Sequence, residues 1–592
     1  MNLPAPALPI TGADVDPASC ETGAAEGRLG DRREGTNKGA AMISDAPDFA
    51  ALSGFAAEIC VIGGGPVGIV TALDLARRGR RVLLLESGGM APRAEAQALS
   101  QAENLDPASH HAPEITVARR LGGASNLWGG RCLPFDPVDF AERPWLGDLP
   151  AWPIGPDALE PWLAPACGWL AAGAAVFAEA LPGVAADDAF GFESLERWSN
   201  RPRIQRLHAA ALAALPNLMV ALGTTALGFE DAPGGAGRVA AVEAHVEGRG
   251  RGRIPAATVV LAAGGNESTR LLLAAQARNP ERFGGPDGPL GRGYMGHVNG
   301  TIADVVFDSR ALHDGLDFHV DGHGSYVRRR LVPSAATQAA ARLTNVAFWP
   351  VVPGIADPGH RSGPLSAVFL ALSAGALGRR LIAEPIRLKH VGPPPYRRGA
   401  HLANVLRDAP RTLGFVPAFL WRNRVARMRL PGFFLRNPAR RYGLEYHAEH
   451  LPHPGSRLTL SQTVDRLGLP RLRVRLAFAE ADAAAVLRAH DALGDWLARN
   501  RLGRIEHRAP EAARVAAVLA EARHGNHQVG TARMGSDRRS AVVDGDCRAF
   551  DAANLYVVST AVLPTSGQAN PTLTAVQLGL RLAARLAGQA RA

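Results

Sequence analysis

The sequence predicts an α/β protein (α+β overall), with a Rossmann-type dinucleotide-binding domain and a second domain built on an antiparallel sheet. Before residue 310 and after residue 500, buried apolar strands and glycine-rich turns alternate with helical patterns. Between these limits, strand-like runs alternate with proline-rich turns. At 592 residues, the chain is also too long for one hydrophobic core. We therefore expect a discontinuous first domain of residues 51–310 and 500–592, and a second domain of residues 311–499.

Composition and charge are those of an ordinary globular protein. Hydrophobic residues make up 47% of the chain and charged residues 20%. The net charge is +10, but no nucleic-acid motif accompanies the scattered arginines, so no nucleic-acid partner is expected. A basic surface that attracts anionic substrates, membranes or partners remains open. The five cysteines form no CxxC pair, which argues against a metal site or a disulfide framework and favours a reducing, cytoplasmic location.

The first residues carry no pattern of a folded element. Residues 1–41 are rich in alanine, glycine, proline and charge, and they lack the apolar region of a signal peptide. Arg32-Arg33 resembles a twin-arginine start, but polar residues follow it. We expect residues 1–50 to be a disordered N-terminal extension, with Met42 as an alternative start. No apolar run reaches 18 residues, so no membrane-spanning helix is predicted.

The first strong motif is a strand–turn–helix–strand unit. An apolar strand at 58–62 is followed at once by Gly63-Gly64-Gly65-Pro66-Val67-Gly68, which reads G-x-G-x-x-G. Residues 69–76 carry helical apolar spacing, and a second strand at 81–85 leads into Glu86. Glu86 comes 23 positions after Gly63, close to the ~20 expected for the acid that binds a ribose hydroxyl.

Each glycine of this motif has a separate physical role. Gly63 permits the tight turn, Gly65 lets the backbone approach a pyrophosphate, and Gly68 lets helix and strand pack closely. The helix N-terminus supplies free N–H donors and a partial positive charge for the phosphates. Because strand, helix, second strand and acid are all present, the unit predicts a dinucleotide site. It does not distinguish FAD from NAD.

Further elements follow in the order expected for such a domain. Residues 90–120 are polar and read as a long loop of the kind that forms lids or binding segments. The small residues of 122–131 permit a close backbone approach to a flat ligand. Strand-like runs occupy 218–222, 239–246 and 258–263. The last of these runs into a helix-capping turn at 264–268, which suggests a strand that returns to the parallel sheet.

The second domain contains a strongly basic stretch at residues 387–441. Arginines there are interleaved with Phe, Leu and Trp421. Residues 415–429 are predicted to form a basic helix. We favour an ordinary surface helix whose arginine stems lie over apolar neighbours, and contact with a membrane or a partner is the alternative.

The C-terminal part carries the most specific pattern. His527 begins the run HQVGTARMG, a strand is predicted at 554–559, and Pro564–Thr574 forms a turn that runs into a long apolar helix. Together with the earlier motifs, these segments resemble the glucose–methanol–choline (GMC) oxidoreductase family. The segments that carry the resemblance are Gly63–Gly68 with Glu86, Gly122–Arg131, Val259–Leu273, Leu290–His297, His527–Gly535 and Asn554–Thr574. The C-terminal pattern is similar to the sugar-oxidising branches, including pyranose oxidase and the flavin subunits of sugar dehydrogenases.

The resemblance implies an FAD-dependent enzyme that oxidises the CH–OH group of an alcohol or sugar by hydride transfer to flavin N5. It places the general base at His527 and a group that stabilises the substrate oxygen at Asn570. Histidine is the usual base near neutral pH, and an amide can donate a hydrogen bond to a developing negative charge. The resemblance also implies that residues 311–499 bind the substrate. Besides Gly63, Gly65, Gly68 and Glu86, it assigns these residues to the cofactor: Gly122, Gly123, Ser125, Asn126, Trp128, Gly129, Ala561, Pro571 and Thr572.

Three points stay open at this stage. Pyranose oxidase bonds its flavin covalently through a histidine, and the matching position here is Leu127, so non-covalent FAD is expected. Oxygen, a quinone or a cytochrome could accept the electrons. Some GMC relatives are hydroxynitrile lyases that hold FAD without net redox chemistry, and this remains the alternative function.

Overall fold

The computed structural model describes residues 42–588, except for 235–236, 427 and 524. The expected disordered extension therefore lies outside the described residues, apart from its last few positions. Ile43–Asp45 forms strand β1, which pairs in parallel with β8, and helix α1 (Phe49–Gly54) follows. The folded region thus begins before the expected boundary at residue 50.

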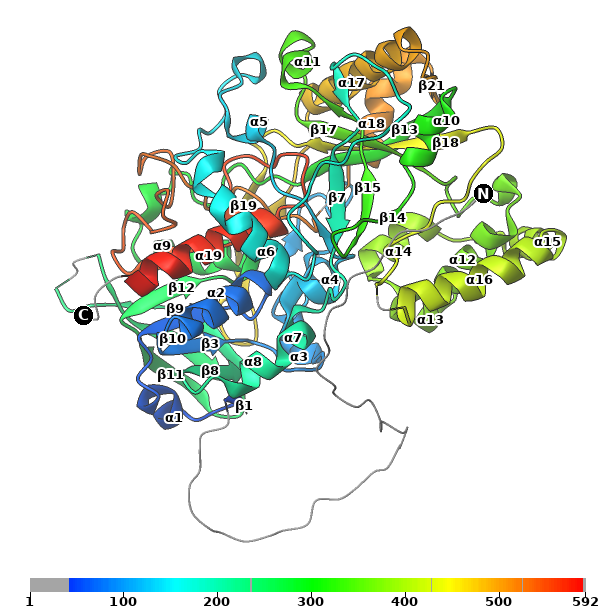
Figure 1. The fold of residues 1–592 in the computed structure, drawn as a ribbon. Helices are drawn as coiled ribbons and strands as arrows, with labels where there is room; N and C mark the ends of the chain where they lie inside the picture. The colour runs from blue at the N-terminus through cyan, green and yellow to red at the C-terminus, as the bar shows by residue number, and fades with distance from the viewer. Residues whose placement is uncertain (1–41, 235–236, 427, 524, 589–592) are drawn as a thin grey trace, which may run out of the picture. The chain divides into compact units, whose positions relative to one another are not determined.

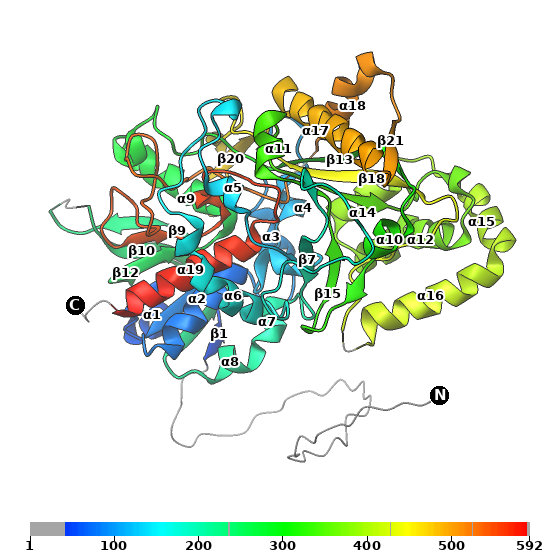
Figure 2. The same ribbon diagram turned by 45° about the horizontal axis from the view of Figure 1, so that its top comes forward.

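A parallel sheet of six strands forms the centre of the first domain, in the order β1-β8-β3-β2-β12-β22 (Figures 1 and 2). Every neighbouring pair in it is parallel. The apolar runs become strands because they are buried on both faces, as is usual for parallel sheets. The strands besides β1 are β2 (Ile59–Ile62), β3 (Val82–Leu85), β8 (Leu218–Leu222), β12 (Thr258–Leu261) and β22 (Leu555–Val557).

Three helices follow three of these strands and complete the Rossmann-type arrangement. They are α2 (Pro66–Arg77), α9 (Gly264–Arg278) and α19 (Thr572–Gly588). Helix α19 packs along α2, and the two lie side by side in Figures 1 and 2. An antiparallel sheet of β9 (Thr224–Asp231), β10 (Val239–Val246) and β11 (Gly250–Pro255) adjoins them. The predicted fold class is confirmed.

The second large sheet is antiparallel, in the order β17-β18-β13-β21. Its strands are β13 (His297–Phe307), β17 (Val346–Val351), β18 (Arg441–Glu449) and β21 (Gly503–His507). Helices α17 (Glu480–Arg499) and α18 (Arg514–Glu521) pack against it and share its hydrophobic core. Strands β13 and β21 lie outside residues 311–499, so the sheet is assembled from both sides of the expected domain limits.

A group of five helices interrupts the strands of this region. Its members are α12 (Gly363–Ser373), α13 (Gly375–Leu381), α14 (Glu384–Val391), α15 (Arg398–Arg407) and α16 (Ala409–Arg424). They share a small core of their own around Phe369 and lie apart from the parallel sheet in Figures 1 and 2. These helices are difficult to predict from the proline-rich sequence, because prolines near a helix N-terminus resemble turn signals.

The remaining elements are short. Residues 90–120, expected to be a loop, contain α3 (Ala94–Ala98), β4 (Glu103–Asn104) and α4 (Pro113–Thr116). The other helices are α5 (Pro137–Phe140), α6 (Leu163–Trp169), α7 (Ile204–Leu207), α8 (Ala209–Ala214), α10 (Arg310–Gly315) and α11 (Ala335–Ala340). The other strands are β5 (Arg131–Cys132), β6 (Phe190–Gly191), β7 (Leu195–Trp198), β14 (His319–Val320), β15 (Tyr326–Arg329), β16 (Val332–Pro333), β19 (Arg457–Val464) and β20 (Pro470–Arg475). Across the described residues, none of the helices has the length and apolarity that crossing a bilayer requires.

The contact between α2 and α19 depends on a glycine that no motif indicated. A Cβ atom at Gly579 would lie 2.6 Å from the hydroxyl oxygen of Thr71 and 3.3 Å from a methyl group of Val67. We predict that Gly579→Leu lowers stability by about 1–3 kcal/mol through overpacking. The fall in melting temperature measures this. Gly168→Leu is the matched control, since Gly168 is an exposed helical glycine whose Cβ would meet nothing within 4 Å. Equal melting temperatures for the two variants would contradict the packing role of Gly579.

Candidate functional site

A cavity opens at the carboxyl edge of the parallel sheet. Its volume is about 220 Å³, slightly below the roughly 300–1,000 Å³ of pockets for drug-sized ligands. The ends of β2 and β3, the start of β9 and the residues that follow β12 and β22 contribute to its wall. In open α/β sheets, ligands bind at this edge. The expected binding loop also reaches it, because residues 99–102, Pro113 and residues 116–119 line the cavity.

Three helix N-termini meet at this cavity. Its wall includes Pro66 at the start of α2, Gly264 at the start of α9 and Thr572 at the start of α19. The first N–H groups of a helix have no partner within the helix, and the helix dipole adds a partial positive charge there. The arrangement therefore favours an anionic ligand such as a pyrophosphate.

The glycines of the first turn occupy different environments. Gly63 has φ +107°, and a Cβ there would lie 2.7 Å from the carbonyl oxygen of Ala262. A Cβ at Gly68 would lie 1.9 Å from the carbonyl oxygen of Gly63, so Gly68 serves backbone packing and does not line the cavity. At Gly65, which does line the cavity, a Cβ would meet no protein atom within 4 Å. The open space above the turn thus lies at Gly65.

Glu86 lies beside the same turn. Its carboxylate accepts hydrogen bonds from the backbone N–H groups of Gly64 (2.9 Å) and Gly88 (2.8 Å). Burial raises the pKa of this carboxyl, while the two backbone donors and the nearby Arg119 act in the opposite direction. A carboxylate oxygen has more than one acceptor position, so Glu86 can hold the turn and also accept a ligand hydroxyl.

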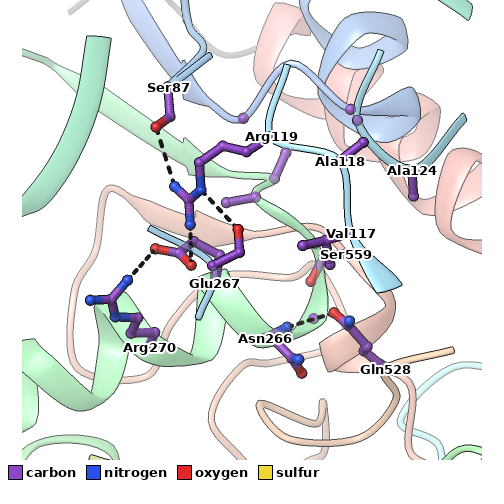
Figure 3. Close-up of a pocket in the computed structure, with 18 of the residues that line it drawn as sticks. Ser87, Val117, Ala118, Arg119, Ala124, Asn266, Glu267, Arg270, Gln528 and Ser559 are labelled. Carbon is purple, nitrogen blue, oxygen red and sulfur yellow. Dashed lines mark hydrogen bonds and ion pairs between the residues drawn. The ribbon is translucent and has the colours of Figure 1, made fainter. Parts of the chain in front are cut away.

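A charged cluster that the motifs did not indicate lies along another part of the cavity wall (Figure 3). Glu267 forms ion pairs with Arg119 (2.6 Å) and Arg270 (3.3 Å), and Arg119 also donates to the hydroxyl of Ser87 (3.2 Å). The side-chain oxygen of Gln528 accepts the N–H of Asn266 (3.0 Å) and so joins the segment after His527 to the start of α9. Of these residues, only Gln528 adjoins a predicted catalytic residue in sequence.

The second glycine-rich segment forms a self-supporting turn. Gly123 lies against Gly65, since a Cβ at Gly123 would be 2.8 Å from the Cα of Gly65. The hydroxyl of Ser125 donates to the carbonyl of Gly122 (2.6 Å), and the amide of Asn126 donates to the carbonyls of Leu121 and Gly123 (both 3.0 Å). Of the predicted residues here, only Gly123 lines the cavity. Ser125 and Asn126 instead fix the backbone on which Gly123 approaches it.

Some of the other residues predicted to bind the cofactor line the cavity, and the rest make contacts elsewhere. Trp128 donates its indole N–H to the carbonyl of Pro202 (2.6 Å), and Gly129 accepts a hydrogen bond from Arg429 (3.1 Å). Ala561 is buried in the core, with its carbonyl bonded to the N–H of Ala532 (2.9 Å). The predicted residues that line the cavity are Gly63, Gly65, Glu86, Gly123, His527, Pro571 and Thr572.

His527 and Asn570, 43 positions apart, are brought into direct contact. The side-chain amide nitrogen of Asn570 lies 3.0 Å from Nε2 of His527. On the other side of the ring, Nδ1 of His527 lies 2.8 Å from Nδ1 of His297, at the start of β13. The amide nitrogen can only donate, so Nε2 of His527 accepts and its ring proton is on Nδ1. Nδ1 then donates to His297.

The surroundings of His527 favour its neutral form. Burial lowers the pKa of His527 well below the usual 6.5, and the nearby His297 and Arg131 lower it further. Arg131 belongs to a buried cluster in which its guanidinium lies over the ring of Trp349 and pairs with Glu196. A neutral imidazole with an accepting Nε2 can take up a proton.

His447 completes a group of three histidines that sequence motifs did not reveal. Its ring stacks on His297 with centroids 4.2 Å apart, and its Nδ1 donates to the carbonyl of Gln568 (2.6 Å). The ring nitrogens of His297, His447 and His527 lie within 4.8 Å of one another, a spacing compatible with a shared cation as well as with shared protons. The expectation of no metal at this site stays a prediction. No sequence motif marks His447. Its place beside His297 follows from the pairing of β18 with β13, which sets His447 opposite Asn299.

Comparison with known proteins gives matches over most of the chain. A family model described as GMC oxidoreductase matches residues 452–579. Paromamine 6'-oxidase from Streptomyces fradiae is 25% identical over 585 residues, 90% of this chain and 91% of that protein. The fructose dehydrogenase large subunit from Gluconobacter japonicus is 32% identical over 145 residues, 24% of this chain and 25% of that protein. The crystal structure of pyridoxine 4-oxidase from Mesorbium loti has a TM-score of 0.51 and 17% identity, and the match covers 90% of this chain and 100% of that one.

The protonation state of His527 can be measured directly. Because its pKa is lowered from 6.5, the ring should stay neutral as the pH falls through 6.5, where an exposed histidine is half protonated. Nitrogen chemical shifts of histidine-labelled protein would show this, with His527→Gln used to assign the signal. An imidazolium at His527 at pH 6.5 would contradict the interpretation.

Proposed function

We propose that this chain, whose residues 452–579 match a family model described as GMC oxidoreductase, is an FAD-dependent enzyme oxidising the CH–OH group of an alcohol or sugar. The observation that carries the proposal is the contact between His527 and Asn570 at a cavity surrounded by three helix N-termini. The contact between His527 and Asn570 suits removal of a hydroxyl proton, and the three helix N-termini suit the binding of a dinucleotide.

The cavity fits FAD on three counts. The empty space at Gly65 leaves room for a pyrophosphate against the backbone, and the start of α2 supplies its donors. Glu86 offers a carboxylate for ribose hydroxyls. Pro571 and Thr572 line the cavity next to Asn570, whose side-chain oxygen is buried and has no hydrogen-bond partner among the described residues. Leu127 offers no group for a covalent bond, so we propose that FAD is held non-covalently.

The protein would contribute the proton transfer and the orientation of the substrate. When bound, FAD supplies the hydride acceptor. Nε2 of neutral His527 would take the hydroxyl proton of the substrate, since its lone pair is already aimed towards a donor. The second N–H of Asn570 would donate to the substrate oxygen as negative charge develops there. His297 would hold the ring of His527 in the required tautomer through the contact between the Nδ1 atoms.

The names of the relatives support the substrate class. Paromamine 6'-oxidase and the fructose dehydrogenase large subunit are named for a sugar-like amine and a sugar. We therefore propose a polyhydroxylated or other small alcohol as the donor. Oxygen, a quinone or a cytochrome remains the proposed acceptor, and the cytoplasmic location remains a prediction.

The role of Gly65 is testable by filling the space above it. Gly65→Val should weaken FAD binding at least tenfold, about 1.4 kcal/mol, because its side chain would occupy the room beside the α2 N-terminus. The affinity is measured by the quenching of flavin fluorescence on reconstitution of the apoprotein. Gly54→Val is the control, since a Cβ at Gly54 also meets nothing within 4 Å but lies in α1, outside the cavity. Unchanged FAD affinity in Gly65→Val would place the pyrophosphate elsewhere.

The catalytic pair is tested by substitution in the FAD-loaded enzyme. His527→Gln should lower kcat by about 10²–10⁴-fold, the usual contribution of a general base. Asn570→Ala should lower it by about 10²–10³-fold, as for the loss of one donor to an oxyanion. FAD content should stay as in the wild type, and His323→Gln, an exposed histidine far along the chain, should retain full activity. A His527→Gln enzyme with wild-type kcat would refute the assignment.

A further inference from the structure

Exposed apolar side chains concentrate on two consecutive helices. Twelve large hydrophobic residues are exposed in the described part of the chain, and six of them lie between residues 402 and 425. Leu402 and Leu406 are on α15, with 53% and 78% of their surface exposed. The other four are on α16 or directly after it: Leu413 (74%), Leu420 (47%), Trp421 (62%) and Val425 (59%). Apolar surface gathered in this way marks a site of interaction.

Helix α16 has two apolar sides. The inner side packs within the helical group, where Phe415 and Phe419 stack on each other and meet the ring of Phe433 edge-on. At about 100° per residue, Leu413, Pro417, Leu420 and Trp421 fall on an outer arc about 100° wide. The inner contacts already account for the packing of α16. The outer arc therefore serves something other than the fold.

The charge of the chain is concentrated around the same helices. Residues 361–440 contain 14 arginines and one lysine against one aspartate and one glutamate. This stretch has thirteen more positive than negative charges, which exceeds the net +10 of the whole chain. The rest of the protein is thus slightly acidic, and the excess of positive charge lies in this stretch.

Many of these cations are left for an outside partner. Eight exposed arginines in this stretch have no carboxylate within ion-pair distance among the residues that the structure describes: Arg361, Arg379, Arg380, Arg397, Arg398, Arg407, Arg411 and Arg422. On α16, Arg411 and Arg422 lie about 80–100° around the helix from the Trp421 edge of the outer apolar arc. A helix with an apolar strip and exposed arginines on another side has the pattern of one that lies in a membrane interface, with tryptophan at the level of the headgroups.

We propose that the outer face of α15 and α16 docks on the surface of an anionic lipid bilayer. The excess positive charge complements anionic headgroups, at about 1 kcal/mol per basic residue near the surface. Leu402, Leu406, Leu413, Leu420 and Trp421 would enter the headgroup boundary. A bilayer fits this face better than a protein partner, because anionic headgroups complement the excess positive charge and no matching groove is required.

The helical group that carries this face contacts the wall of the cavity described above. Helix α14 of the same group contacts α4, and Pro113 and Thr116 at the two ends of α4 line the cavity. Arg429, just beyond α16, donates to the carbonyl of Gly129 in the second glycine-rich turn. A bilayer under this face would therefore bring lipid-soluble molecules close to the site.

The proposal is tested by flotation of the purified full chain with lipid vesicles. Binding is expected to vesicles of phosphatidylcholine with phosphatidylglycerol, to weaken in high salt, and to be much weaker with phosphatidylcholine alone. The triple variant Leu413→Ser/Leu420→Ser/Trp421→Ser should lose at least about tenfold in affinity for the mixed vesicles. The control is Met90→Ser/Val320→Ser/Val464→Ser, which removes three exposed apolar side chains from other elements and should bind like the wild type.

A second pair of variants separates local from overall charge. Arg411→Gln/Arg422→Gln should weaken binding to the mixed vesicles, whereas Arg249→Gln/Arg539→Gln, with the same change in net charge, should not. Melting temperatures check that each variant folds. Failure of the wild type to float, or equal flotation of all variants, would overturn the proposal. So would ultracentrifugation showing that the wild type dimerises through this face and the triple variant does not. None of these measurements requires FAD or turnover, so they are independent of the proposed function.

Discussion

Backbone-to-backbone packing at the end of β2 is the constraint on which the rest of the site depends. Gly68 lies so close to the carbonyl of Gly63 that no side chain fits, and a Cβ at Gly63 would lie 2.7 Å from the carbonyl oxygen of Ala262, directly after β12. These contacts join the first turn, the start of α2 and the approach to α9. Gly123 then packs on Gly65 from the second glycine-rich turn. The cavity exists because four backbone segments approach one another without side chains between them.

The polar groups of the site, in contrast, are side chains that the fold brings together from distant segments. His297, His447, His527 and Asn570 come from β13, β18 and two C-terminal segments, and they contact one another because the start of β13 and the end of β18 lie beside those two segments. Burial keeps His527 neutral, and the two neighbouring side chains fix which nitrogen carries its proton. The fold thus combines an electropositive cavity, suited to a dinucleotide, with a base that stays unprotonated.

Local patterns predicted the first domain well, because buried parallel strands and glycine turns depend on nearby sequence. The strands at 59–62, 82–85 and 258–261 and the turn at Gly63–Gly68 follow the expected pattern. Pairing between distant segments was less accessible: His447 is placed by its register with β13, and no motif marks it. Ser125 and Asn126 were assigned to the cofactor, yet their side chains hold the turn that carries Gly123. The helices between 363 and 424 were mostly missed, since their prolines resemble turn signals.

The central claim is that the cavity holds a flavin that oxidises an alcohol with His527 as the base. The most direct measurement is the visible absorption of the flavin-loaded protein when a polyol or sugar is added without oxygen. The account predicts that the oxidised flavin band bleaches, in proportion to one equivalent of substrate per flavin, and recovers when an acceptor is admitted. Turnover of a substrate with no bleaching would indicate a lyase and contradict the account.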